Sequence, residues 1–397
     1  MQSQYKILTL KPNREKSVLN KHPWLFSGAI DVKPNQKISN GEIVAINSSK
    51  GERLGYGFYT TESQIVCKMF EFTNVNFDNF DTVFWKEKIE TAFYKRKQFI
   101  NTETTNTYRL IHAEGDFLPG LIADVYGDLL VLQLLTKGVS LMGETLKTIF
   151  QELGFQFIYV KVKASTQNIE KDDASSYWLT SPRELKVVVK ENNVLFNIDI
   201  EKGQKTGFFI DQRNNRAIVE QFSRNKKVLN CFSYNGGFSL YALKGQATEV
   251  ISVDISEHAI QESRENAVLN GFESKHTGIA ADCFDYLRKI EKDHYDVIIL
   301  DPPAFAKNAR AVQKAAQGYK DINLQAMKNI KKGGLLFTFS CSQHIDFVLF
   351  QQIMFAAAAD ANRNVQIVKR LEQCEDHPIS IFHPEGEYLK GFMLLVD

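Results

Sequence analysis

The stretch Val297 to Phe305, which reads VIILDPPAF, contains residues whose types and order suit chemistry. An apolar run bounded by a charge and prolines predicts a strand buried on both faces of a parallel sheet, and ligands bind beyond the carboxyl ends of such strands. Asp301 follows this strand directly. Pro302 and Pro303 lock the backbone φ and remove N–H donors, which favours a fixed loop. We therefore expect an active-site loop at Asp301.

A second apolar run, Leu335 to Ser342 (LLFTFSCS), ends on Cys341. One predicted strand end thus offers a carboxylate and another offers a thiol. A lone cysteine at a strand end is by default an inert buried residue. The presence of the DPPAF sequence in the same predicted sheet favours the other interpretation, in which Cys341 is a nucleophile.

The predicted strand Lys227 to Cys231 leads into a loop that closes on Gly236 and Gly237 and opens a helix. This turn is typical of nucleotide-binding folds. It lacks the GxGxxG spacing that allows close approach to a pyrophosphate, so a dinucleotide is disfavoured. A single adenosine ligand without phosphates fits the loop better.

Acids follow the next two predicted strands. Asp254 comes after Glu249 to Val253, where a carboxylate can accept hydrogen bonds from both ribose hydroxyls. Asp282 follows a strand that ends near Ala280, where it can accept a hydrogen bond from an adenine amino group. Either residue could instead be a helix cap. Four successive strand ends that carry Gly-Gly, Asp, Asp and DPP are harder to attribute to capping.

Length and composition indicate a globular protein. A chain of 397 residues that is 44% hydrophobic suggests two or three domains. The sequence has no run of eighteen apolar residues and no signal-peptide pattern, so we expect a cytoplasmic protein. The five cysteines are odd in number, far apart and without a CxxC pair, so we expect neither a disulfide framework nor a metal site.

The net charge of +1 does not by itself indicate nucleic-acid binding. Lysine and arginine are nevertheless concentrated in residues 1–25 and 305–333. The simplest interpretation is that both segments are solvated faces. The second segment follows the DPPAF loop directly, and this position favours a role at the mouth of the site.

The chain divides into three predicted domains, 1–72, 73–189 and 190–397. In the first domain, apolar and polar residues alternate with a period of two between glycine turns, as in a small β-barrel. Its aromatic residues could stack bases or fill the core. The second contains a predicted helix from Thr82 to Phe99 with Asp81 as N-cap, then a loop and two strands around a turn at 126–128. The third alternates strands with helices, which is typical of a doubly wound α/β domain.

These strand-end motifs resemble those of class I S-adenosylmethionine-dependent methyltransferases. Longer strings narrow the resemblance to the bacterial large-subunit (23S) rRNA cytosine-5 methyltransferase family. They are HPWLFSGAI, DFLPGLIADVYG, KTGFFIDQR, VLNCFSYNGGFSLYAL, VDIS, LDPPAFAK, GYKDIN, FTFSCS and HPEGEYLKGF. The resemblance spans nearly the whole chain. It implies an N-terminal PUA-like RNA-binding domain, a central small α+β domain and a C-terminal Rossmann-like methyltransferase domain.

The resemblance also implies roles for particular residues. Cys341 would add to C6 of cytosine, and Asp301 would contact the base or the amino group of the donor. Phe305 could stack on a flipped base or anchor the core, and Lys307 would lie on the substrate side. A second-cysteine release mechanism is unsupported, because Ala304 follows Pro303. The cofactor-binding positions would be Asp211, Gln212, Arg213, Asn230, Phe232, Gly236, Asp254, Ile255, Asp282, Cys283 and Asp301.

Some of these assignments have structural alternatives. Arg213 could be a salt-bridge partner rather than a ligand for the methionine end of the donor. Cys231 and Cys283 lie beside the cofactor motifs but next to buried strand segments, so both side chains are interpreted as structural. For His377 and His383 the structural interpretation is preferred to a place at the substrate mouth.

Two other functions are consistent with the sequence. A nitrogen methyltransferase acting on guanine or another amino group also suits an acid followed by two prolines, but it has no use for the Cys341 thiol. A non-catalytic RNA-binding ribosome assembly factor would keep the fold only as a scaffold. The partner in each case is rRNA, and a homodimer is the oligomer to expect if one forms.

Overall fold

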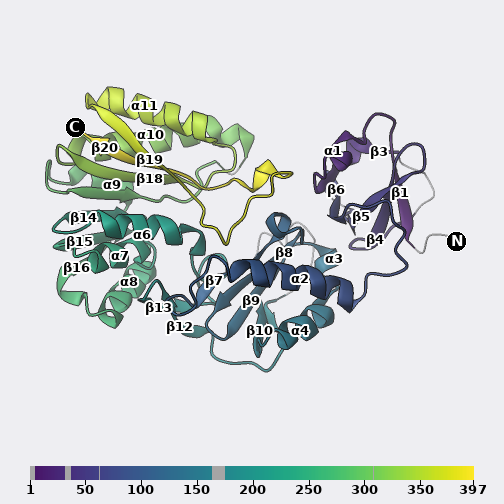
Figure 1. Cartoon of the computed structure of the whole chain (residues 1–397). Helices are drawn as coiled ribbons and strands as arrows, with labels where there is room; N and C mark the ends of the chain where they lie inside the picture. The colour runs from purple at the N-terminus through teal and green to yellow at the C-terminus, as the bar shows by residue number, and fades with distance from the viewer. Residues whose placement is uncertain (1–4, 32–36, 62, 163–174, 307) are drawn as a thin grey trace. The chain divides into compact units, whose positions relative to one another are not determined.

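The computed structural model describes residues 5–31, 37–61, 63–162, 175–306 and 308–397. The chain forms two compact units (Figure 1). The first consists of Met1–Val189, Ile198–Ile210 and Glu375–Gly386. The second consists of Lys190–Asn197, Asp211–Cys374 and Glu387–Asp397.

The first unit begins with a six-stranded sheet of order β2-β6-β5-β4-β1-β3. A short helix α1 (Lys16–Leu19) lies between its first two strands in the chain. Tyr56 and Phe58 are buried, so these aromatic side chains fill the core. The strands are β1 (Lys6–Leu10), β2 (Trp24–Phe26), β3 (Ile30–Asp31), β4 (Ile43–Asn47), β5 (Arg53–Tyr59) and β6 (Ile65–Glu71).

A second sheet in this unit has the order β11-β10-β9-β8-β7. The helix α2 (Thr82–Arg96) starts where predicted, and the Asp81 carboxylate accepts a hydrogen bond from the Phe84 N–H at 3.1 Å. The predicted hairpin at 126–128 joins β8 and β9. The other elements are α3 (Lys137–Ser140), α4 (Gly143–Glu152), β7 (Thr107–His112), β8 (Leu121–Tyr126), β9 (Leu129–Leu134), β10 (Phe157–Val160) and β11 (Tyr177–Trp178).

The prediction of a loop from residue 108 to this hairpin was wrong over its first part, because Thr107–His112 form a strand. These residues form β7, which pairs antiparallel with β8. Leu110 and Ile111 are fully buried, so the segment gains hydrophobic contact by joining the edge of the sheet. A two-stranded sheet of β12 (Lys186–Glu191) and β13 (Val194–Asp199) follows in the chain.

The second unit contains a seven-stranded sheet of order β16-β15-β14-β17-β18-β20-β19. The first five of these strands are parallel, and β20 is antiparallel to both of its neighbours. This architecture confirms the predicted doubly wound α/β domain. The strands are β14 (Lys227–Cys231), β15 (Glu249–Asp254), β16 (His276–Ala280), β17 (Val297–Leu300), β18 (Gly334–Ser340), β19 (Val365–Glu372) and β20 (Lys390–Val396).

Helices cover both faces of this sheet, and Figure 1 shows α10 and α11 together on one side of the strands. Alternate residues of β17 point into different cores. Ile298 and Leu300 belong to the core under α9, α10 and α11, whereas Val297 and Ile299 belong to the core under α6 and α7. The helices are α6 (Arg213–Gln221), α7 (Gly237–Lys244), α8 (Glu257–Leu269), α9 (Cys283–Lys289), α10 (Val312–Asn329) and α11 (Phe347–Ala361).

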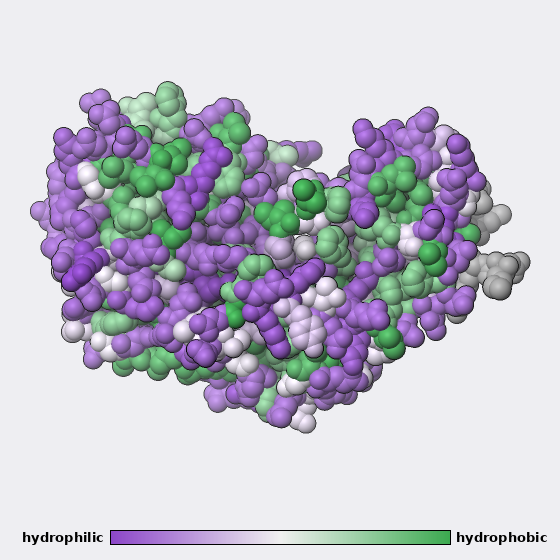
Figure 2. All heavy atoms as spheres, in the orientation of Figure 1, coloured by the Kyte–Doolittle hydropathy of each residue, from purple (hydrophilic) through white to green (hydrophobic). Residues whose placement is uncertain are grey.

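Hydrophilic side chains dominate the face drawn in Figure 2, with apolar patches between them. Among the described residues, no helix combines the length and the apolar character that crossing a membrane requires.

A buried ion pair in the second unit was not foreseen from the sequence. The Arg216 guanidinium donates two hydrogen bonds to the Glu191 carboxylate, at 2.8 and 2.7 Å, and both side chains are almost completely buried. The Tyr241 hydroxyl donates to Glu191 Oε1 at 2.9 Å. Burial lowers the pKa of Arg216, but Glu191 outweighs this effect and the pKa is raised. The pair therefore ties β12 to α6 and α7.

Replacing Arg216 by methionine should leave Glu191 buried without its cation. We expect the Arg216→Met variant to lose about 3–5 kcal/mol of unfolding free energy, because an uncompensated charge in a protein interior is costly. Urea denaturation followed by circular dichroism would measure this loss. The control is Lys227→Met, since Lys227 Nζ lies 3.7 Å from Glu249 in a partly exposed pair and should contribute less than about 1 kcal/mol. Equal losses in the two variants would contradict the prediction.

Candidate active site

The carboxyl ends of five neighbouring strands lie along one edge of the seven-stranded sheet. Pairing is parallel between β16 and β15, β15 and β14, β14 and β17, and β17 and β18. The order of connection reverses at β14, and open α/β sheets bind ligands at such a point. Along this edge lie the predicted site positions Asp282, Asp254, Gly236, Asp301 and Cys341.

The loop after β14 has an unusual backbone. Phe232 and Tyr234 have φ angles of 59° and 47°, and Gly236 has a φ of 85°. Left-handed conformations cost bulky residues about 1–3 kcal/mol each and are common at ligand sites. A Cβ atom at Gly236 would lie only 2.5 Å from Ser263 Oγ, so the loop passes very close to α8. Glycine is therefore required at position 236 for two independent reasons.

Asp254 holds the loops that follow β14 and β15. Its Oδ2 atom accepts a hydrogen bond from the Tyr234 N–H at 2.9 Å, and its Oδ1 atom accepts one from the Ser256 N–H at 3.0 Å. The N-cap of α8 is Ser256, so Asp254 is not a simple helix cap. Ile255 is 74% exposed and offers an apolar surface beside the carboxylate.

Asp282 is the N-cap of α9. Its Oδ1 atom accepts hydrogen bonds from the N–H groups of Phe284 and Asp285, at 2.8 and 3.1 Å. These contacts are those of a helix cap, which was one of the two interpretations of Asp282 from the sequence. A hydrogen bond from Asp282 to adenine stays a prediction. Cys283 is buried, and its Sγ atom accepts from the Phe232 N–H at 3.2 Å. The Cys283 side chain is structural, because it supports the loop after β14.

The segment Asp211–Arg213 spans the last residues of a 3-10 turn and the start of α6, and its three side chains are buried. The Tyr388 hydroxyl donates a hydrogen bond to Asp211 Oδ2 at 2.6 Å. Gln212 Oε1 accepts one from Asn215 Nδ2 at 2.6 Å. These contacts order the segment, and its role toward a cofactor stays a prediction.

Cys341 comes directly after β18 and is partly exposed, whereas the other four cysteines are buried. Its Sγ atom lies 3.9 Å from the carbonyl oxygen of Pro302, so the thiol is beside the loop that carries Asp301. Ser342 joins the two loops, since its Oγ atom accepts from the Ala306 N–H at 3.1 Å. The structure thus places the predicted thiol and the predicted carboxylate loop next to each other.

Two protein-family models match parts of the chain. Residues 109–384 match the family described as S-adenosylmethionine-dependent methyltransferase, and residues 8–72 match the PUA-like domain. The chain belongs to the S-adenosylmethionine-dependent methyltransferase family. This confirms S-adenosylmethionine as the cofactor.

The methyltransferase is 40% identical over 397 residues to the ribosomal RNA large subunit methyltransferase I of Shewanella denitrificans, covering 98% of this chain and 99% of the relative. It is 39% identical over 396 residues to the protein of the same name in Pseudoalteromonas atlantica, with coverage of 98% and 99%.

Two solved structures share the fold of this chain. A methyltransferase complexed with SAH has a TM-score of 0.84 at 23% identity, covering 98% of this chain and 100% of that chain. A SAM-dependent methyltransferase from Streptococcus mutans has a TM-score of 0.82 at 22% identity, with the same coverage.

The residues of this methyltransferase fit an adenosine-containing donor. Among the described residues, Ser233 Oγ and Asn230 Oδ1 are buried and have no hydrogen-bond partner. Buried polar atoms of this kind are uncommon in folded proteins, and a bound polar ligand would satisfy them. The close approach of the loop at Gly236 and the exposed side chain of Ile255 suit the same ligand.

Phe305 packs in the core beneath α10. Its ring centroid lies 4.6 Å from that of Tyr319 and 5.9 Å from that of Phe284. These contacts are those of a side chain that anchors the core. Stacking of Phe305 on a flipped base stays a prediction. Lys307 lies outside the described residues.

Acidic residues neutralise part of the basic segment 305–333. Lys320 Nζ lies 2.6 Å from Asp360, and Lys331 Nζ lies 3.1 Å from Asp296. The segment therefore presents less positive charge than its sequence suggests.

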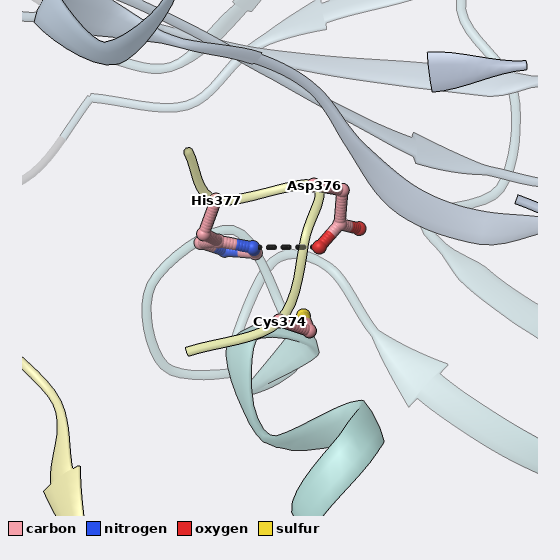
Figure 3. Close-up of side chains that lie close together, drawn as sticks. All are labelled: Cys374, Asp376 and His377. Carbon is pink, nitrogen blue, oxygen red and sulfur yellow. Dashed lines mark hydrogen bonds and ion pairs between the residues drawn. The ribbon is translucent and has the colours of Figure 1, made fainter. Parts of the chain in front are cut away.

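His377 and His383 are packed inside the first unit. His377 Nδ1 lies 2.9 Å from Asp376 Oδ1 (Figure 3), and Asp376 Oδ2 accepts from the Arg109 N–H at 2.9 Å. The His383 ring centroid lies 4.5 Å from the Trp24 ring. Burial is the main reason that the pKa of His383 is lowered. The contacts of both histidines are structural.

Sequence reasoning assigned no role to several residues that support the site. The Tyr319 hydroxyl lies 3.0 Å from Ser342 Oγ, and Tyr388 binds Asp211. Both tyrosines occur in strings that carried the family resemblance, GYKDIN and HPEGEYLKGF. Their presence in those strings was the available signal, but only the folded chain shows which atoms they hold.

Replacing Gly236 by alanine should weaken cofactor binding. We expect the Gly236→Ala variant to bind S-adenosylmethionine at least about tenfold more weakly, because the strain and the contact with Ser263 together amount to more than about 1.4 kcal/mol. Isothermal titration calorimetry would measure the affinity. Gly271→Ala is the matched control, since Gly271 has a similar φ of 72° but nothing within 4 Å of an added Cβ. Unchanged affinity in Gly236→Ala would contradict this account of the loop.

Proposed function

We propose that this methyltransferase transfers a methyl group from S-adenosylmethionine to C5 of a cytosine in large-subunit ribosomal RNA, through a covalent adduct with Cys341. The names of its relatives, which cover nearly all of the chain, support the ribosomal RNA substrate. The observation that carries the covalent route is the partly exposed Cys341 thiol, 3.9 Å from the Pro302 carbonyl oxygen on the edge that carries the cofactor loop.

The chemistry explains the need for a thiol. S-adenosylmethionine supplies a methyl group on a sulfonium, but C5 of cytosine is a poor nucleophile when unaided. The Cys341 thiolate donates an electron pair to C6 to form an S–C6 bond, and the π electrons of the C5–C6 double bond move to C5. The methyl group then forms a bond to C5 as its bond to the sulfonium breaks, which leaves S-adenosylhomocysteine.

The adduct then collapses. A base removes the proton from C5, and the electrons of that C–H bond re-form the C5–C6 double bond. The S–C6 bond breaks, and its electron pair returns to Cys341 as the thiolate. Asp301 lies on the loop beside the thiol, where it would contact the cytosine or the amino group of the donor.

The remaining residues would bind and orient the two ligands. Asp254 would accept hydrogen bonds from the ribose, and Ile255 would pack against the adenine. Asp211 and Arg213 would contact the methionine end. The target base must leave its stack to reach such a site, because a base inside a helix cannot approach a thiol at a strand end.

Methylation of a nitrogen atom in rRNA is the second candidate reaction. It needs only a nitrogen lone pair aligned with the methyl group, so an acid and two prolines suffice. The position of Cys341 favours the cytosine route, since nitrogen methylation has no use for an accessible thiol at this place.

Replacing Cys341 by alanine should abolish the reaction. We expect 5-methylcytidine formation to fall by at least about 10³-fold, as it does when a covalent nucleophile is removed from other enzymes. The measurement uses unmodified 23S rRNA, or ribosomal particles, with methyl-labelled S-adenosylmethionine, followed by digestion to nucleosides and identification of the labelled one. The control is Cys67→Ala, which removes a buried thiol from the N-terminal sheet and should retain the activity.

Each other outcome has a defined meaning. Label in a different nucleoside, unaffected by Cys341→Ala, would contradict the cytosine-5 proposal and support nitrogen methylation. An absence of label on both naked rRNA and particles would support a non-catalytic assembly factor.

A further inference from the structure

Lys390 is almost completely buried at the start of β20, which is uncommon for a lysine. Its ammonium donates hydrogen bonds to the carbonyl oxygens of Ser342, at 2.9 Å, and Tyr388, at 2.8 Å. The antiparallel register places Lys390 opposite Ser340, the residue before Cys341. The lysine is therefore anchored to the residue that follows Cys341 and paired with the residue that precedes it.

We propose that Lys390 is a positioning residue: its ammonium stabilises Cys341 as a thiolate and holds the turn after Cys341 against the Asp301–Pro303 loop. This inference deepens the proposed function, on which it rests. A cysteine is a nucleophile only as the thiolate, and a neighbouring cation is a common way to favour that form. Two of the three ammonium N–H groups bind carbonyl oxygens, which leaves one for the thiolate.

The charges around Lys390 agree with this arrangement. Burial lowers the pKa of Lys390 and outweighs the opposite effect of negative charge on Cys341, Glu387 and Asp346. A thiolate at Cys341 and an ammonium at Lys390 would therefore stabilise each other's charge. Cys341 is partly exposed and so differs from Cys67 and Cys231, since burial raises the pKa of both of those thiols.

Other titratable groups near the thiol would oppose its ionisation. Asp301 lies on the adjacent loop, and the Tyr319 hydroxyl reaches the turn from α10. Burial raises the pKa of Tyr319, and charge on Cys341 raises it further. Carboxylates at Asp346 and Glu387 act in the same direction as Asp301. Lys390 is a cation that contacts this turn through a hydrogen bond of its own, to the carbonyl oxygen of Ser342.

The pH dependence of Cys341 alkylation tests the proposal without RNA or cofactor. We would treat the full-length protein with iodoacetamide from pH 5 to 10 and follow the peptide that contains Cys341 by mass spectrometry. Cys341→Ser gives the background. We expect a midpoint at least about one pH unit below that of a free thiol, about 8.5. A wild-type midpoint at or above about 8.5, the value of a free thiol, would overturn the proposal irrespective of the results for the variants.

Two variants separate charge from packing. Lys390→Met should raise the midpoint by at least about one unit, which is tenfold in the thiolate fraction at neutral pH. Lys390→Arg keeps a permanent charge and should stay within about half a unit of the wild type. A thermal melt and calorimetric binding of S-adenosylmethionine verify folding. A folded Lys390→Met with an unchanged midpoint would show that Lys390 only supports the turn.

The outcome is separable from that of the methylation assay. An acidic Cys341 thiol that depends on Lys390, in a protein that makes no 5-methylcytidine, would leave this inference standing and reject the proposed function. Formation of 5-methylcytidine with no effect of Lys390→Met on the alkylation midpoint would support the proposed function and reject the role of Lys390.

Discussion

Burial of the central strands on both faces is the constraint on which the site depends. The residues of β17 alternate between two hydrophobic cores, and every side chain of that strand is buried. Such a strand cannot carry a polar side chain without a large cost, so polar chemistry is confined to its ends. Because β14, β15, β16, β17 and β18 are parallel, their carboxyl ends all meet at one edge.

The two halves of that edge are held by different kinds of contact. On the side of β14 and β15, the Asp254 carboxylate and the Cys283 thiol accept hydrogen bonds from backbone N–H groups of the loop after β14. On the thiol side, hydroxyl groups of Ser342 and Tyr319 join the end of β18 to the loop after β17. The contacts to the loop after β14 compensate for the left-handed conformations of Phe232 and Tyr234.

The start of β20 reaches both sides of the site. Tyr388 binds Asp211, which begins the segment assigned to the cofactor, and Lys390 binds the turn after Cys341. The antiparallel strand thus inserts a buried cation beside a strand end that faces solvent. A parallel strand at the same place would present its amino end at the opposite edge of the sheet, and its first residue could not reach this turn.

The sequence by itself determined the α/β fold of the catalytic part, the start of α2, and the strand ends that carry Asp254, Asp301 and Cys341. These features depend on local patterns of apolar residues, caps and glycines, which act over a few positions. Only the tertiary structure decided the contacts of Arg216 with Glu191 and of Lys390 with the thiol turn. The partners in these pairs are 25 and 48 residues apart, and no local pattern predicts a contact that exists only once distant segments pack together.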